Sequence, residues 1–166
     1  MKHILAIILV LAVSVLCGCQ TIARYQQKEQ EKMSMQKTCQ FLKEAKHYFL
    51  ATVENDQPRV RPFGTIHIFE GKLYIQTGRR KNVAKQLLAN GKVELCAMKG
   101  DEWIRVSGIL VDDNRREAKV AMLEDYKSLQ SMYSPDDDNT MVLYFLPGSV
   151  TATIWSFHHE PIVMKF

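Results

Sequence analysis

Short segments rich in apolar residues, separated by turn residues, fill most of the chain beyond residue 47. The separators include Asn55-Asp56, Glu70-Gly71 and Pro147-Gly148. Such segments predict strands, and we expect them at residues 48–53, 59–69, 72–77, 93–98, 102–111, 141–146, 150–157 and 162–166. Many short strands with few helices favour a small antiparallel barrel, although periodicity alone also allows an OB-like or sandwich fold.

Three helices are expected among these strands. Thr38 can cap a short helix that buries Phe41 and Leu42, and a second helix covers residues 82–89 before the stop signal Asn90-Gly91. Asn114 can cap a third helix that runs to about residue 129. Within 59–69, a proline and a glycine predict an edge, a bulge or a close approach of a ligand to the backbone.

The N-terminus has the pattern of an export signal. Two basic residues precede the apolar run 4–16, and Leu16-Cys17-Gly18-Cys19 follows it. We interpret residues 1–18 as a lipoprotein signal peptide, Cys19 as the lipidated residue, 19–37 as a polar tether and 38–166 as the folded domain. An uncleaved N-terminal anchor is the alternative, and both place the protein in the cell envelope, on the periplasmic or extracellular face of a bacterial membrane. An internal start at Met33 or Met35 would give a cytoplasmic form.

Charge and cysteine spacing exclude several functions. The net charge is only +4 and there is no basic tail, so nucleic acid is not an expected partner. The domain holds Cys39 and Cys96 without any CxxC or Cys/His spacing, so no metal site is expected. The two thiols could pair after export, or Cys96 is a small buried hydrophobe. His158-His159-Glu160 is interpreted as an exposed turn.

Basic and hydroxyl-bearing residues gather around the turn between 72–77 and 82–89. Gly78 permits a tight turn there, just before a helix whose free N–H groups favour anions. The side chains that can reach a phosphate at this point are Thr77, Arg79, Arg80, Lys81 and, from the neighbouring strand, Arg61. Charge-assisted donors of this kind replace the water of a phosphate dianion. A solvated cationic loop is the alternative interpretation.

Three runs of the sequence, Pro58–Gly64, Tyr74–Asn82 and Trp103-Ile104-Arg105, resemble the flavin-binding split-barrel family of pyridoxamine 5'-phosphate oxidase, in its small bacterial branch. The resemblance covers about residues 35–166. It implies a mostly β (α+β) fold, a six-stranded antiparallel Greek-key split β-barrel with a few short helices. It also implies a homodimer that binds flavin mononucleotide (FMN) between its subunits.

The resemblance assigns roles to individual residues. It makes Arg61, Arg80 and Lys81 phosphate ligands, and it places Trp103 and Arg105 near the cofactor, often across the dimer interface. The remaining expected FMN-binding residues are Pro62, Phe63, Gly64, Gln76, Thr77 and Asn82. No catalytic residue is identified.

The resemblance implies an FMN-dependent oxidoreductase that passes electrons from a small donor, a nicotinamide or another reductase, to an unknown small acceptor. The alternative is a non-catalytic flavin or haem binding or sensing module, in which His67 or His158 would be the axial ligand of haem. Vitamin B6 oxidation is not expected, because the sequence ends at Lys165-Phe166 without the Arg-containing segment that grips pyridoxal phosphate in true oxidases.

Overall fold

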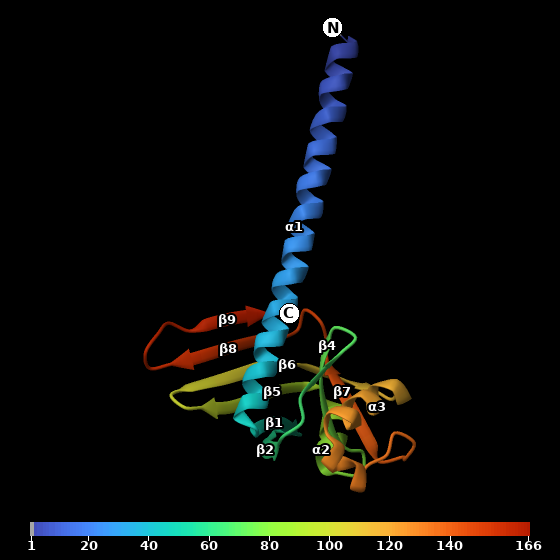
Figure 1. Cartoon of the computed structure of the whole chain (residues 1–166), viewed down its shortest axis with the longest axis vertical. Helices are drawn as coiled ribbons and strands as arrows, with labels where there is room; N and C mark the ends of the chain where they lie inside the picture. Colours follow the sequence, from blue (N-terminus) through green and yellow to red (C-terminus); the bar gives the residue numbers. More distant parts are fainter. Residues whose placement is uncertain (1) are drawn as a thin grey trace.

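An antiparallel barrel with one long helix rising from it makes up the molecule (Figure 1). The computed structural model describes the backbone of residues 2–166 and the side chains of residues 20–166. The strands are β1 (Tyr48–Glu54), β2 (Gln57–Phe63), β3 (His67–Phe69), β4 (Lys72–Gly78), β5 (Lys92–Lys99), β6 (Glu102–Asp113), β7 (Thr140–Phe145), β8 (Thr151–Ser156) and β9 (Ile162–Lys165). The helices are α1 (Lys2–Ala45), α2 (Asn82–Ala89), α3 (Arg116–Asp125) and the 3-10 helix η1 (Lys127–Ser131).

Strand β6 holds the two halves of the barrel together. The strand order is β2-β1-β5-β6-β7-β4-β3, and β8 pairs with β6 and β9. Residues 102–107 of β6 pair with β8, whereas residues 110–113 pair with β7. Gly108 lies between these two stretches, and a Cβ atom there would come within 2.8 Å of the Phe145 ring. Only glycine therefore allows β6 to pass so close to β7.

The core fills the barrel with the inward-facing residues of its strands. Leu50, Leu95 and Ile104 are completely buried, and α2 closes one end of the barrel with Val83 and Leu87. A second, smaller cluster lies on the outer side of β4 and β7 under α3. Burial of these apolar side chains is the main stabilisation of such a fold.

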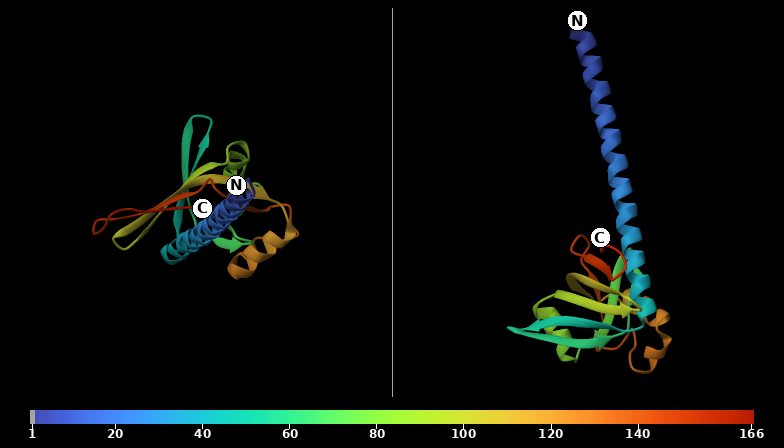
Figure 2. Two further views of the ribbon diagram at one scale, coloured as in Figure 1. Left: turned by 90° about the horizontal axis from the view of Figure 1, so that it is seen from above. Right: turned by 90° about the vertical axis from the view of Figure 1, so that its left-hand side faces the viewer.

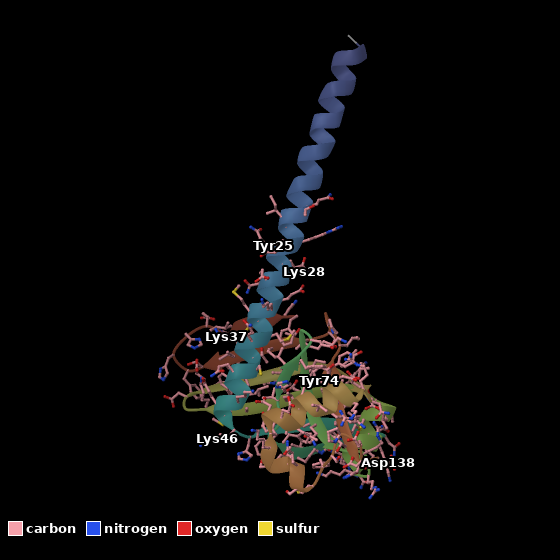
Figure 3. The ribbon with its side chains drawn as sticks, turned by 45° about the vertical axis from the view of Figure 1, so that its right-hand side comes forward. Tyr25, Lys28, Lys37, Lys46, Tyr74 and Asp138 are labelled. Atoms are coloured by element: carbon pink, nitrogen blue, oxygen red, sulfur yellow. The ribbon has the colours of Figure 1, made fainter. Side chains whose placement is uncertain are left out.

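Only the C-terminal turns of α1 pack on the barrel, where Phe41 and Leu42 are buried. The rest of the helix runs away from the strands (Figure 2), and Tyr25 and Lys28 lie on this projecting part (Figure 3). Residues 20–37, predicted as a polar tether, are helical here. Within the described part of the chain, no helix is long and apolar enough to span a membrane. The predicted signal peptide at 1–18 and the lipidated Cys19 fall outside the residues whose side chains are described.

The structure confirms the predicted fold class, a mostly antiparallel split barrel, here with nine strands. The single strand predicted at 59–69 is wrong: β2 ends at Phe63, which pairs with the first residue of β1, and the chain then crosses to pair with β4 as β3. The predicted cap at Thr38 is also wrong. Thr38 lies inside α1, and its hydroxyl donates to the carbonyl of Ser34.

The third predicted helix is shorter than expected. α3 begins after Arg115, without a side-chain cap from Asn114, and the segment expected to continue as α-helix is the 3-10 helix η1. Just before the helix, the carboxylate of Asp113 accepts the backbone N–H of Arg115.

Candidate functional site

A cavity of about 220 Å³ opens between the end of β2, the end of β4, the start of α2 and the segment that follows α3. Three stretches far apart in the sequence meet there because β4 pairs with β7 and because the chain leaves β2 to reach β4. The cavity is lined by Pro62, Phe63, Gly64, Thr65, Gln76, Thr77, Lys81, Leu129, Met132 and Tyr133. Six of the predicted site residues are therefore brought together.

Two buried polar side chains line the cavity without hydrogen-bond partners. Gln76 is 5% exposed and Thr77 is 4% exposed. Neither amide atom of Gln76 nor the hydroxyl of Thr77 has a partner among the described residues. The backbone beside them is fixed, since the hydroxyl of Thr65 accepts the N–H of Gln76 at 2.9 Å. A buried polar group left unpaired costs about 1–3 kcal/mol, so this arrangement is suited to a polar ligand.

Positive charge gathers at the α2 end of the cavity. Lys81 precedes the first residue of α2 and lines the cavity. Arg79 points elsewhere, because its guanidinium pairs with both carboxylate oxygens of Asp112 at 3.0 Å. Among the described residues, neither Arg80 nor Lys81 forms an ion pair, and the backbone N–H of Arg80 donates to Asn139. Asn82, also predicted, is the exposed first residue of the helix.

Arg61 lies beneath α2 and does not line the cavity. Its guanidinium donates to the hydroxyl of Thr52 and to the side-chain oxygen of Gln86, both at 2.6 Å, and to the carbonyl of Leu50. Burial and the neighbouring Arg59 lower the pKa of Arg61. The guanidinium is thus held by neutral acceptors, one residue away from the cavity wall at Pro62.

Trp103 and Arg105 lie on a different surface. The Trp103 ring stacks on Trp155 with centroids 6.3 Å apart, and Arg105 pairs with Glu94 at 2.7 Å. This surface is the outer face of β2, β1, β5, β6, β8 and β9. One register row joins it to the cavity rim, from Pro62 through Phe49 and Cys96 to Arg105. Three strand spacings make this row roughly 14 Å long.

Sequence reasoning missed the wall formed by Leu129, Met132 and Tyr133. An ideal Cβ atom on Gly78 would lie 3.2 Å from the Tyr133 hydroxyl, so this phenol reaches directly over β4. The following loop is ordered by Asp137. Burial opposes ionisation of this carboxyl, but N–H donors of the loop outweigh it and lower its pKa to about 2. The spacing of Ser134 and Asp137 is the sequence signal that could have indicated this turn.

The other polar residues considered from the sequence have partners away from the cavity. His67 binds Asp125 at 2.8 Å, and His158 is exposed beside Asp101. The hydroxyl of Tyr74, which could have lined the cavity, donates to Asp113 instead. Within the described residues no cluster of three or more metal-ligating side chains occurs. Both Cys39, inside α1, and Cys96 are free thiols.

The model of the pyridoxamine 5'-phosphate oxidase family matches residues 35–152. The chain therefore belongs to this oxidase-like split-barrel family. A NimC/NimA family protein from Clostridium acetobutylicum is 42% identical in sequence, with 84% of this chain and 96% of that chain covered and a TM-score of 0.80.

More distant structures share the fold alone. A pyridoxamine 5'-phosphate oxidase-related, FMN-binding protein from Nostoc punctiforme is 19% identical, with 74% of this chain and 88% of that chain covered and a TM-score of 0.50. A heme-binding protein from Mycobacterium smegmatis is 11% identical, with 75% and 57% covered and a TM-score of 0.57. Among curated proteins there is no match.

The residues present fit a flavin nucleotide. The unpaired amide of Gln76 offers one donor and one acceptor, which the pyrimidine edge of a flavin can match. Phe63, Leu129 and Met132 provide apolar walls for a flat ring. Lys81 and the start of α2 lie at the end of the cavity where a phosphate would need positive charge.

Proposed function

We propose that the chain binds FMN in this cavity and serves as a redox protein. The observation that carries the proposal is the pair of buried side chains Gln76 and Thr77, unpaired among the described residues, in a cavity that the cation Lys81 also lines. A bound flavin supplies one- and two-electron transfer. The chain binds and orients the ring through Gln76, excludes water with its apolar walls, and places positive charge that favours an anionic ligand.

The lining of the cavity limits what the chain itself contributes. Its only titratable side chains among the described residues are Lys81 and Tyr133. No histidine, cysteine or carboxylate is among the lining residues, so Lys81 and Tyr133 are the side chains there that could transfer a proton. This lining suits direct electron transfer from a small donor to a small acceptor. It equally favours the second candidate, a flavin-binding module without turnover, and the two are separated by a steady-state assay with a nicotinamide donor and a quinone or nitroaromatic acceptor.

A haem module is the less supported alternative. Of its expected axial ligands, His67 binds Asp125 and His158 lies beside Asp101. Neither histidine lines the cavity. If haem were the ligand, the purified protein would show a Soret band that His67→Ala or His158→Ala removes. We expect a two-banded yellow spectrum that both variants leave unchanged.

The test of FMN binding is a visible spectrum of the purified full chain, with the released ligand identified by mass spectrometry. Lys81→Ala should weaken FMN binding about 10- to 100-fold, the range for loss of a charge-assisted hydrogen bond. Lys85→Ala is the matched control, because Lys85 is exposed on the same helix away from its start. A colourless protein that takes up no added FMN would refute the proposal.

We also propose that two copies pair through the outer face of the sheet. This face exposes large apolar side chains, including Phe49, Val60 at 64% and Met98 at 67% exposure. Large apolar side chains that gather on one exposed face are typical of interfaces. Because Pro62 and Arg105 end one register row on this face, a second copy would bring its Trp103 and Arg105 toward the cavity rim. Sedimentation velocity tests this pairing, and a monomer at micromolar concentration would count against it.

Finally, we propose that lipidated Cys19 tethers the protein to the outer face of a bacterial membrane. The sequence around Cys19 supports this, and so does the course of α1, which runs away from the barrel (Figure 1). Metabolic labelling with a fatty acid should mark the wild type and the Cys17→Ser variant but not Cys19→Ser. Equal labelling of Cys19→Ser would exclude this anchor.

A further inference from the structure

Tyr133 presents a phenolic hydroxyl at the cationic end of the cavity. This hydroxyl would lie 3.2 Å from a Cβ atom on Gly78, and the ammonium of Lys81 lies 6.0 Å from the centre of its ring. Among the described residues it has no hydrogen-bond partner, although the side chain is half-buried. An O–H group held there is a donor without an acceptor, beside Asn139, whose side-chain oxygen already accepts the N–H of Arg80.

The neighbours of this hydroxyl form a set suited to an anion. Among the described residues, Lys81 forms no ion pair and the hydroxyl of Thr77, a residue only 4% exposed, has no hydrogen-bond partner. The helix α2 begins at Asn82 without a side-chain cap. The first N–H groups of a helix attract phosphate. The buried, unpaired Thr77 hydroxyl is independent of the helix end, and it points to a ligand at the same place.

We propose that Tyr133 is a phosphate ligand, donating its phenolic hydrogen to an oxygen of a phosphomonoester held at the start of α2. The identification of the ester as FMN rests on the proposed function, whereas the anion site does not. Tyr133 comes from the connection between α3 and β7, outside the runs that carry the family resemblance. It therefore adds a donor from a third segment, besides those on β4 and at the start of α2.

The segment that carries Tyr133 also explains how a ligand can enter. η1 has no buried residue, and its backbone bonds are local, as in the bond from the Tyr133 N–H to Leu129. The segment is anchored at one end by Tyr126, whose hydroxyl bonds both the N–H and the carbonyl of Ile66. At the other end it is anchored by Asp137. A phosphate held by Tyr133 would tie this segment, residues 127–133, which we call the strap, to the cavity that Gln76 also lines.

The test compares FMN with riboflavin, which lacks the phosphate. Full-length wild type, Tyr133→Phe and the control Tyr144→Phe are titrated with each ligand by fluorescence quenching. Tyr144 belongs to β7, where its ring lies under the ammonium group of Lys72, and it does not line the cavity. Tyr133→Phe should weaken FMN about tenfold, equal to about 1.4 kcal/mol, and should leave riboflavin affinity within twofold of wild type. Equal losses for both ligands, or no loss for FMN, overturn the proposal.

A second arm uses inorganic phosphate on FMN-free protein, followed by calorimetry. Phosphate binding that is weakened in Tyr133→Phe and retained in Tyr144→Phe supports the assignment of Tyr133 as a phosphate ligand. This holds even if FMN fails to bind, because that failure would refute only the proposed function. Wild-type protein that binds no phosphate, or Tyr133→Phe that binds it as wild type does, overturns the assignment. A circular dichroism spectrum of each variant confirms that the fold is retained.

Discussion

Gln76 gives a prediction in which stability and binding move in opposite directions. Its amide is buried in the lining of the cavity, and neither its nitrogen nor its oxygen has a partner. Gln76→Met keeps the length of the side chain and removes its polar atoms. The FMN-free variant should therefore be more stable than wild type, whereas its FMN affinity should be lower.

The magnitude follows from the cost of an unpaired buried group. Removing it should raise the free energy of unfolding by roughly 1–3 kcal/mol, which is about 3–8 °C in Tm for a domain of this size. Two lost neutral hydrogen bonds to the ligand should weaken FMN by about 1–3 kcal/mol. At 100 times the wild-type Kd, FMN stabilises wild type by about 2.7 kcal/mol, and the variant should lose about 0.9–2.4 kcal/mol of this gain.

The assay is urea unfolding of the full chain with and without FMN. Gln86→Met is the matched control, because Gln86 is equally buried but accepts from Thr52 and Arg61 and donates to Glu54. Removing that satisfied amide should destabilise the protein by about 1–3 kcal/mol. If Gln76→Met destabilises the FMN-free protein as Gln86→Met does, the Gln76 amide is satisfied in the fold and the reasoning fails.

Three further predictions concern acid stability, pairing and the strap. Burial opposes ionisation of Asp113, but bonds from Arg115 and Tyr74 lower its pKa from 3.8 to about 2, so its contribution is present above pH 4 and lost as pH falls toward 2. Asp113→Asn should flatten the dependence of the free energy of unfolding on pH in that window. Val60→Glu, on an exposed edge strand, should yield a folded monomer by sedimentation; an unchanged dimer would place the interface elsewhere. Tyr126→Phe should cost about 1–2 kcal/mol and speed hydrogen exchange at 127–133, and unchanged exchange would show that the strap is anchored otherwise.

The barrel was predictable where local pattern and tertiary pairing agree. The helix at 82–89 is found with its predicted bounds, because its apolar spacing matches the face that closes the barrel. The break after Phe63 was not predictable from periodicity. The apolar pattern continues through Ile66, and the strand ends only because β1 has no further residue to pair with it. The predicted cap at Thr38 is wrong because the short helix expected there is the C-terminal part of α1. Burial of Thr38 inside this helix overrides its preference for a helix end.

The site was predictable only in part, for the same reason. Gln76, Thr77 and Lys81 are close in sequence to the glycine turn, so a local pattern locates them. Tyr133 reaches the cavity through the pairing of β4 with β7, and no local pattern encodes that contact. The charges of Arg79, Arg80 and Lys81 alone could not indicate which of the three points away from the cavity. The answer depends on Asp112, which is distant in sequence and pairs with Arg79.

If the proposed dimer forms, the position of Arg105 would make FMN binding and dimer formation linked equilibria. If a second copy brings Arg105 to the cavity rim, FMN must strengthen the dimer by the same factor by which the dimer strengthens FMN. Couplings of this kind are typically 5- to 150-fold. Arg105 is exposed and, among the described residues, forms an ion pair with Glu94 alone. Arg105→Ala should therefore reduce the coupling while leaving dimerisation without FMN nearly unchanged. Sedimentation equilibrium at two FMN concentrations measures both constants. A dimer constant that does not respond to FMN would mean that each subunit completes its own site, and Trp103 and Arg105 would then serve only the interface.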